Sequence, residues 1–87
     1  MTITSANFET EVSQSTKPVL LDFFAEWCGP CKVLGPILEQ IGEENTDNLK
    51  IVKIDVDVSY DLATKFGISA MPTMILIKDG AEIRKNV

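Results

Sequence analysis

The sequence has no histidine, and only 2 of its 87 residues are cysteine. A chain without histidine has no Ser-His or Cys-His catalytic pair and no His ligand for haem, and two cysteines alone do not complete a tetrahedral zinc site. We therefore expect no metal and no bound cofactor. The chemistry open to this chain centres on the sulfur atoms of Cys28 and Cys31.

Positive charge and long apolar runs are also scarce. The chain carries 8 Lys and Arg against 13 Asp and Glu, a formal net charge of -5 at pH 7, so a nucleic acid would be repelled before contact. No apolar run approaches about 18 residues, and residues 1–10 lack both the positive cluster and the apolar stretch of a secretory signal. We expect no nucleic-acid partner, no membrane partner and a cytoplasmic location.

Length and composition predict one folded domain. A length of 87 residues leaves no room for a second domain, and 45% apolar with 24% charged residues is typical of a chain that folds around a core. Residues 1–87 are therefore expected to form a single domain.

Hydrophobic periodicity alternates between helical and strand spacing along the first half of the chain. Ser5, followed by Glu9, predicts the cap of a short helix. Residues 19–25 are apolar on both alternate faces except at Asp22, which predicts a central strand covered on each side. A long helix is predicted from residue 29 or 30 to about residue 44, with apolar positions at Val33, Leu34, Ile37, Leu38 and Ile41.

The second half of the chain continues the alternation. Residues 49–58 alternate apolar and polar, which predicts a half-covered strand, and residues 60–66 followed by Gly67 predict a shorter helix. Residues 74–77 and 81–84 flank a Lys-Asp-Gly turn and predict a β-hairpin. This order predicts an α/β fold: a mixed sheet with flanking helices, parallel in its first part and ending in an antiparallel hairpin.

The two cysteines stand three positions apart, where the apolar strand gives way to the long helix. This spacing puts their Cα atoms about 5 to 6 Å apart, within reach of a disulfide. Unpaired N–H groups and the helix dipole favour a thiolate at Cys28, which is predicted to be the nucleophile. Cys31, one turn further in and less exposed, would resolve the mixed disulfide. Gly29 leaves the approach open, and Pro30 suits the first helical turn.

Two other interpretations of the cysteine pair stay open. The pair could supply half of a metal site shared with a second chain, or it could form an inert structural disulfide. We favour catalytic redox use, because the C-x-x-C pattern lies at a strand-to-helix junction within an alternating order of strands and helices.

The residues around the pair resemble the thioredoxin family. The segment Asp22–Lys32 reads DFFAEWCGPCK, and Asp55–Asp57, Gly67-Ile68 and Met71–Thr73 follow in that family's order and at matching separations. The resemblance extends from about residue 2 to residue 87. It implies a thioredoxin-like fold and a general protein-disulfide reductase, which acts on disulfide-bearing proteins by dithiol-disulfide exchange and is recharged by thioredoxin reductase. The alternative is a redox-inactive, thioredoxin-shaped binding or assembly module.

The resemblance gives two charged residues a role. Burial in a strand covered on both faces should raise the pKa of Asp22, and the family pattern implies that this acid exchanges a proton with Cys31. An ordinary aspartate at an edge is the alternative. Lys53 resembles the family's lysine near that acid and would modulate it; the alternative is a merely solvated lysine.

A docking surface for the substrate is also implied. Trp27 either fills the core or receives the partner protein, and we favour the second because an aromatic side chain covers much area at little entropy cost. Pro72 resembles the family's cis-proline facing the cysteines, where the backbone of Met71 would hydrogen-bond an extended substrate peptide.

The sequence departs from the family pattern at its end. Members of the family continue past the last strand through a glycine and a terminal helix that packs on the sheet, whereas this sequence stops at Val87. A fragment, a covering subunit or a marginal domain would each account for the difference. Apolar sheet surface left uncovered beside the long helix would invite self-association.

Overall fold

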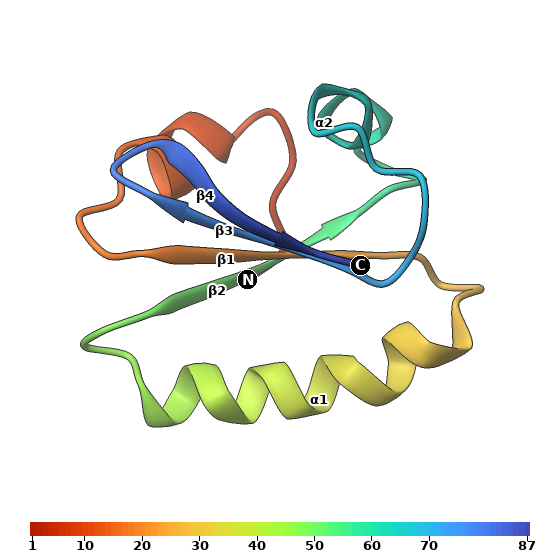
Figure 1. The fold of residues 1–87 in the computed structure, drawn as a ribbon, viewed down its shortest axis with the longest axis horizontal. Coiled ribbons are helices and arrows are strands. Elements are labelled where there is room, and N and C mark those ends of the chain that lie inside the picture. Colours follow the sequence, from red (N-terminus) through yellow and green to blue (C-terminus); the bar gives the residue numbers. More distant parts are fainter.

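A computed structural model describes residues 1–87 as a four-stranded sheet with helices on both faces (Figure 1). In chain order the elements are η1 (Glu9–Ser13), β1 (Val19–Phe24), α1 (Gly29–Glu44), β2 (Lys50–Asp55), α2 (Tyr60–Lys65), β3 (Thr73–Lys78) and β4 (Ala81–Asn86). The strand order is β2-β1-β3-β4, with β1 parallel to β2 and antiparallel to β3, and β4 antiparallel to β3. The predicted α/β fold with a mixed sheet is confirmed. No helix is both long and apolar enough to cross a membrane.

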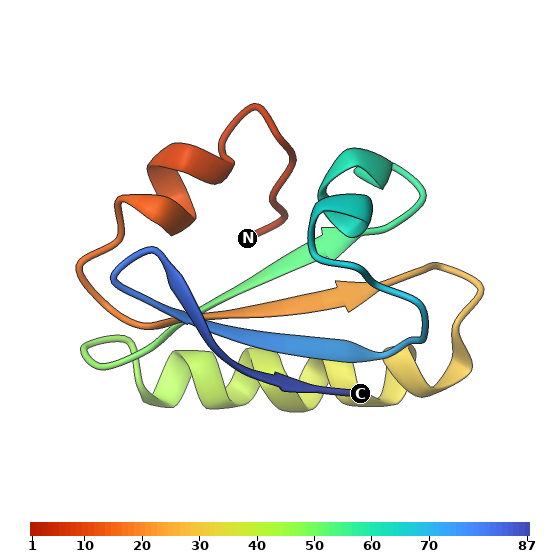
Figure 2. The ribbon, with the colours of Figure 1, turned by 45° about the horizontal axis from the view of Figure 1, so that its top comes forward.

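The apolar core lies on one face of the sheet, beneath η1 and α2 (Figure 2). Strand residues reach it at alternate positions because successive side chains of a strand point to opposite faces. Helix α1 lies alone on the other face and contributes nothing to this core. The core consists of Ile3, Phe8, Val12, Val19, Leu21, Phe23, Val52, Ile54, Leu62, Ile75 and Ile77.

The amino-terminal helix differs from its prediction. Ser5 caps nothing; the chain turns instead where Asn7 Oδ1 accepts a 2.8 Å hydrogen bond from the Thr4 N–H. The helix is a single wide π turn, in which the Gln14 N–H donates to the Glu9 carbonyl at 3.0 Å. The amide of Asn7 orders the turn, and the helix therefore starts four residues after Ser5.

Helix α1 has the predicted bounds, but three of its five predicted apolar positions face outward. Val33, Ile37 and Ile41 are 68%, 51% and 38% exposed. The sheet covers only the row that carries Cys31, Gly35 and Leu38, which are the buried residues of the helix. Because the five apolar positions occupy two neighbouring rows of the helix, a single sheet face does not bury them all.

Strand β2 is shorter than predicted. It ends at Asp55, because the Asp55 side chain accepts the Asp57 N–H at 2.9 Å and the Asp55 carbonyl accepts the Val58 N–H at 3.2 Å. These bonds turn the chain, so the predicted alternation stops and Val58 is 71% exposed. Helix α2 ends one residue before its predicted end, and Gly67 follows with a φ of 65°.

The predicted hairpin is confirmed. Strands β3 and β4 are joined by Asp79 and Gly80, whose φ angles of 52° and 79° are those that a tight hairpin turn requires. The antiparallel hairpin completes the sheet on the side of β1 opposite β2.

Candidate active site

The cysteines lie where β1 ends and α1 begins. Cys28 is the residue that precedes the helix, with extended backbone angles, and Pro30 stands in the first helical turn. Cys28 and Cys31 form a disulfide, and their Cα atoms are 5.3 Å apart, as the spacing in the sequence predicted. The start of the helix thus holds both sulfur atoms at the same edge of the sheet.

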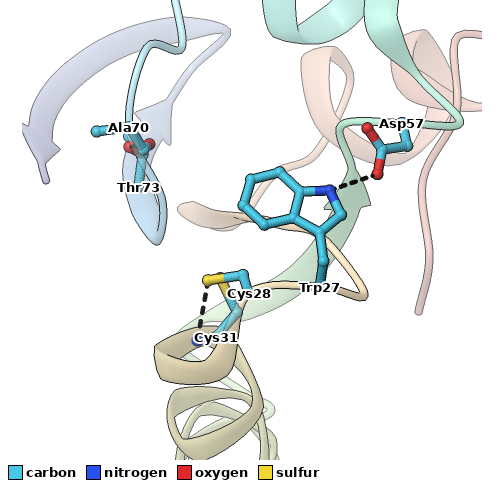
Figure 3. The surroundings of a disulfide bond; sticks show 6 residues. All are labelled: Trp27, Cys28, Cys31, Asp57, Ala70 and Thr73. Atoms are coloured by element: carbon cyan, nitrogen blue, oxygen red, sulfur yellow. Dashed lines mark hydrogen bonds between the residues drawn. A yellow bond between two sulfur atoms is a disulfide. The ribbon is translucent and has the colours of Figure 1, made fainter.

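The sulfur of Cys28 receives a hydrogen bond from the helix. The Cys31 N–H donates to Cys28 Sγ at 3.2 Å (Figure 3). Exposure does not distinguish the two cysteines, contrary to expectation: each is 5% exposed. Ala25, Phe24, Val56 and Met71 pack around the pair and cover both residues.

Trp27 lies on the surface beside the disulfide. It is 70% exposed, so the interpretation as core filling is wrong. Its Nε1–H donates to Asp57 Oδ2 at 2.9 Å, which fixes the plane of the indole (Figure 3).

Asp57 was not predicted from the sequence as the acceptor of the Trp27 indole N–H, although the pairing of the strands indicates it. Strands β1 and β2 are parallel, and Phe24 pairs with Asp55 at their shared carboxyl end. Residues that follow two neighbouring parallel strands meet at one edge of the sheet, so Trp27 and Asp57 are brought together.

The segment before β3 faces the disulfide from across the site. The Met71–Pro72 peptide bond is cis, as the resemblance implied. Met71 is half-buried and packs against Ala25 and the cysteines. Thr73, which sequence reasoning passed over, is 1% exposed and donates its hydroxyl to the Ala70 carbonyl, closing the turn that carries the proline (Figure 3).

Asp22 is buried on β1, on the sheet face that α1 covers. It is 1% exposed, and its Oδ1 has no hydrogen-bond partner. Burial raises the pKa of Asp22 above its ordinary value of 3.8, and the positive charge of Lys53 opposes part of that rise. The alternative of an ordinary aspartate at an edge is wrong.

Lys53 is the partner of Asp22 in the register of β1 and β2. Its ammonium group forms an ion pair with Glu39 of α1 at 3.1 Å, not with Asp22. It also lies 5.3 Å from the centre of the Phe24 ring. The lysine is therefore held in place above the buried acid. No group of three or more His, Cys, Asp or Glu side chains lies close enough together to hold a metal ion.

Comparison with known proteins identifies the family. The model of the thioredoxin family matches residues 1–87. The chain belongs to the thioredoxin family. It is 51% identical to thioredoxin of Mycolicibacterium smegmatis over 87 residues, 98% of this chain and 78% of that protein. It is 45% identical to thioredoxin of Bacillus subtilis over 84 residues, 97% of this chain and 79% of that protein.

A third relative is named as a bifunctional protein. The chain is 44% identical over 85 residues to the bifunctional thioredoxin reductase/thioredoxin of Mycobacterium leprae, 98% of this chain but 19% of that protein. Membership of the thioredoxin family, together with the Cys28–Cys31 disulfide, makes this chain a thiol-disulfide oxidoreductase. It reduces protein disulfides by dithiol-disulfide exchange.

Proposed function

We propose that Cys28 attacks the substrate and Cys31 completes the exchange. The Cys28 thiolate attacks one sulfur of a substrate disulfide and forms a mixed disulfide, while the other substrate sulfur leaves as a thiolate. The Cys31 thiolate then attacks Cys28 Sγ, and the second substrate sulfur leaves. The cysteine pair returns to its disulfide form, and the substrate gains the two electrons and two protons that the pair loses.

The hydrogen bond at the start of α1 carries this assignment. Cys28 Sγ accepts the Cys31 N–H, and backbone N–H groups at a helix start stabilise negative charge on sulfur. Cys31 lies inside the helix and has no equivalent position. The same bond therefore favours the thiolate at Cys28, the residue that attacks first.

Asp22 is proposed to exchange a proton with Cys31. A buried carboxyl with a raised pKa takes up and returns a proton more readily near neutral pH than an exposed one. Above that pKa the carboxylate accepts the Cys31 proton, so the second step slows as the pH falls through it. Lys53, held above Asp22, modulates how easily the acid ionises.

Five residues are proposed to form the docking surface. Gly29 and Pro30 are exposed, and nothing lies within 4 Å of the position that a Cβ on Gly29 would take, so a substrate can approach the sulfur. Figure 3 shows Trp27 and the pair Ala70 and Thr73 on opposite sides of the disulfide. Met71, which packs against the cysteines, and Pro72 lie between Ala70 and Thr73 in the chain. An extended substrate peptide would lie between Trp27 and this segment and hydrogen-bond the Met71 backbone.

The partners are proposed to be disulfide-bearing proteins as substrates and a thioredoxin reductase as electron donor. The bifunctional relative joins these two activities in one chain, which supports a reductase partner. The reaction uses the cysteine pair and needs no further cofactor. A reducing cytoplasm is the compartment that suits a disulfide reductase, and we propose it for this protein.

Residues 1–87 are proposed to act as one domain that can self-associate. The radius of gyration of 11.9 Å matches the ~12 Å typical of a single domain of this length. On the sheet face beside α1, Leu20, Met74 and Leu76 are only half-buried, and a second copy would cover this apolar sheet surface. Sedimentation of the wild type and of Leu76→Glu tests this: a dimer lost in the variant supports it, and a monomer at high concentration rejects it.

Trapping of the mixed disulfide tests the division of labour. The reduced Cys31→Ser variant should accumulate a covalent complex with a disulfide-bearing protein such as insulin, because no second thiol releases it. The Cys28→Ser variant should not. Equal trapping by both variants on a non-reducing gel, measured at matched concentrations, would reject the assigned roles.

A further inference from the structure

The ammonium group of Lys53 lies between two carboxyl groups. From β2, Lys53 pairs in register with the buried Asp22 of β1, and it reaches outward to Glu39 Oε1 of α1 at 3.1 Å. The ion pair forms with Glu39, while Asp22 Oδ1 stays without a partner. The cation that acts on the buried acid is thus engaged by an outer carboxylate.

A glycine makes this arrangement possible. Gly35 lies in the middle of α1, where glycine costs about 1 kcal/mol relative to alanine. A Cβ at this position would lie 3.3 Å from Lys53 Nζ, closer than a side chain normally allows. The missing side chain therefore leaves the space that the ammonium group occupies beside Glu39.

The ion pair also borders the surroundings of both Asp22 and Cys31. A pocket of about 760 Å³ is lined by Asp22, and a second of about 260 Å³ is lined by Cys31. Both pockets are lined by Gly35, Glu39 and Lys53. A shift of the lysine would change the charge near Asp22 and the boundary between the two pockets together.

We propose that Glu39 is a positioning residue: its carboxylate holds the Lys53 ammonium group away from Asp22 and so sets how readily Asp22 gives up its proton. Without Glu39, Lys53 would turn toward the unpartnered Asp22 Oδ1, the nearest carboxylate left to it in the register. A cation close to a carboxylate favours the charged form. This inference rests on the proposed proton exchange between Asp22 and Cys31.

Other charged groups line the same two pockets. Lys50 is engaged by its own ion pair with Glu11, and Met74, the neighbour of Asp22 on β3, carries no charge. The charged residues that line one or both pockets, beside Asp22, Glu39 and Lys53, are Lys17, Glu26, Lys32, Glu43 and Lys50, and Met1 adds its amino terminus. None of these residues forms an ion pair with Lys53; Glu39 does.

Titration of the Asp22 carboxyl by NMR tests the proposal. We would use the oxidised protein, because disulfide-bonded cysteines do not titrate and leave the Asp22 signal uncoupled from them. In the Glu39→Gln variant, Asp22 should ionise at lower pH, and its ionisation constant should rise at least about threefold. A like charge near Asp22 is lost, and Lys53 is released to approach it. Glu43→Gln is the matched control: it lies one turn on, is exposed and loses the same charge, but has no contact with Lys53.

A second background shows whether the effect passes through Lys53. In Lys53→Met, adding Glu39→Gln should move the Asp22 titration no further than adding Glu43→Gln. A shift in Glu39→Gln no larger than that of Glu43→Gln, or a shift that persists without Lys53, would overturn the proposal. The titration measures the charge on Asp22 in the absence of turnover. It therefore tests the role of Glu39 even if Asp22 takes no part in the reaction. Whether Asp22 takes part is tested separately, by the turnover of Asp22→Asn.

Discussion

On the sheet face beneath η1 and α2, β1 presents Val19, Leu21 and Phe23, which are at most 1% exposed and lie in the apolar core. On the face beneath α1, the same strand presents half-buried Leu20 and Phe24 around buried Asp22. One strand thus carries a stabilising face and a chemical face.

The difference between the two faces shows that stability and chemistry depend on different sides of the sheet. Burial of apolar side chains supplies most of the stability of a small domain, and the α1 face gives up part of it to hold a carboxyl and an ammonium group beside two pockets, one of which Cys31 lines. Substitutions on the two faces should therefore separate stability from turnover.

The largest effect is expected in the apolar core. Phe23→Ala should lower the free energy of unfolding by about 3–5 kcal/mol, because it leaves a cavity at a fully buried position. Denaturant unfolding measures it. Ile54→Val, a milder change in the same core, should cost about 0.5–1.5 kcal/mol and retain turnover, in case the larger change prevents folding.

An outward-facing residue of α1, the helix that covers the chemical face, provides the contrast. Ile37→Ala, at a position 51% exposed, should change the free energy of unfolding by no more than about 0.5 kcal/mol. Equal losses in Phe23→Ala and Ile37→Ala would mean that the two faces do not differ as described.

Asp22 should give the opposite pattern, with turnover lost and stability gained. Its folded pKa is raised, so the folded state binds its proton more tightly than the unfolded state does, and stability falls as the pH rises from 3.8 through the folded value. Asp22→Asn removes this ionisation penalty and should therefore be more stable than the wild type at pH 7, by about 1.4 kcal/mol for each pH unit by which burial raises the pKa of Asp22. The gain should shrink as the pH falls from the folded pKa toward 3.8 and should be nearly absent below pH 3.8.

Stopped-flow mixing of the reduced protein, with Cys31 intact, and a disulfide-bearing substrate completes that experiment. Release by Cys31 should slow in Asp22→Asn and lose its dependence on pH near neutrality. An unchanged pH profile would remove Asp22 from the reaction, and a variant less stable than the wild type at pH 7 would contradict the penalty assigned to its burial.

The sequence predicted the elements well and their exposure less well. The strand-helix-strand order, the disulfide spacing and the Asp79-Gly80 turn depend on local spacing and turn chemistry, which a sequence displays directly. The outward row of α1 was missed, because periodicity marks a helix as amphipathic without telling how wide a face the sheet covers.

The candidate site divides in the same way. The cysteines, Asp22 and the cis-proline were visible as motifs, whereas the Trp27–Asp57 and Lys53–Glu39 contacts join side chains 30 and 14 positions apart. Such pairs depend on register and on which strands are neighbours. The cap at Ser5 failed for a local reason: Asn7 competes for the same turn.

A smaller effect on function is expected at the docking surface. Asp57→Ala removes the acceptor of the Trp27 Nε1–H bond and should weaken substrate binding by about 0.5–1.5 kcal/mol, seen as a raised KM with kcat nearly unchanged. Trp27 fluorescence anisotropy should fall as the indole gains freedom. Asp61→Ala, which removes an exposed carboxylate four residues further along the chain, in α2, is the charge control and should leave the anisotropy unchanged.

The central claim is that the start of α1 holds the Cys28 sulfur ready to ionise. The most direct measurement is the pH dependence of alkylation of Cys28 by iodoacetamide in the reduced Cys31→Ser variant, in which no second thiol competes. The account predicts that the reaction reaches half its maximal rate well below pH ~8.5, the midpoint of free cysteine. A midpoint at or above that of free cysteine would contradict it.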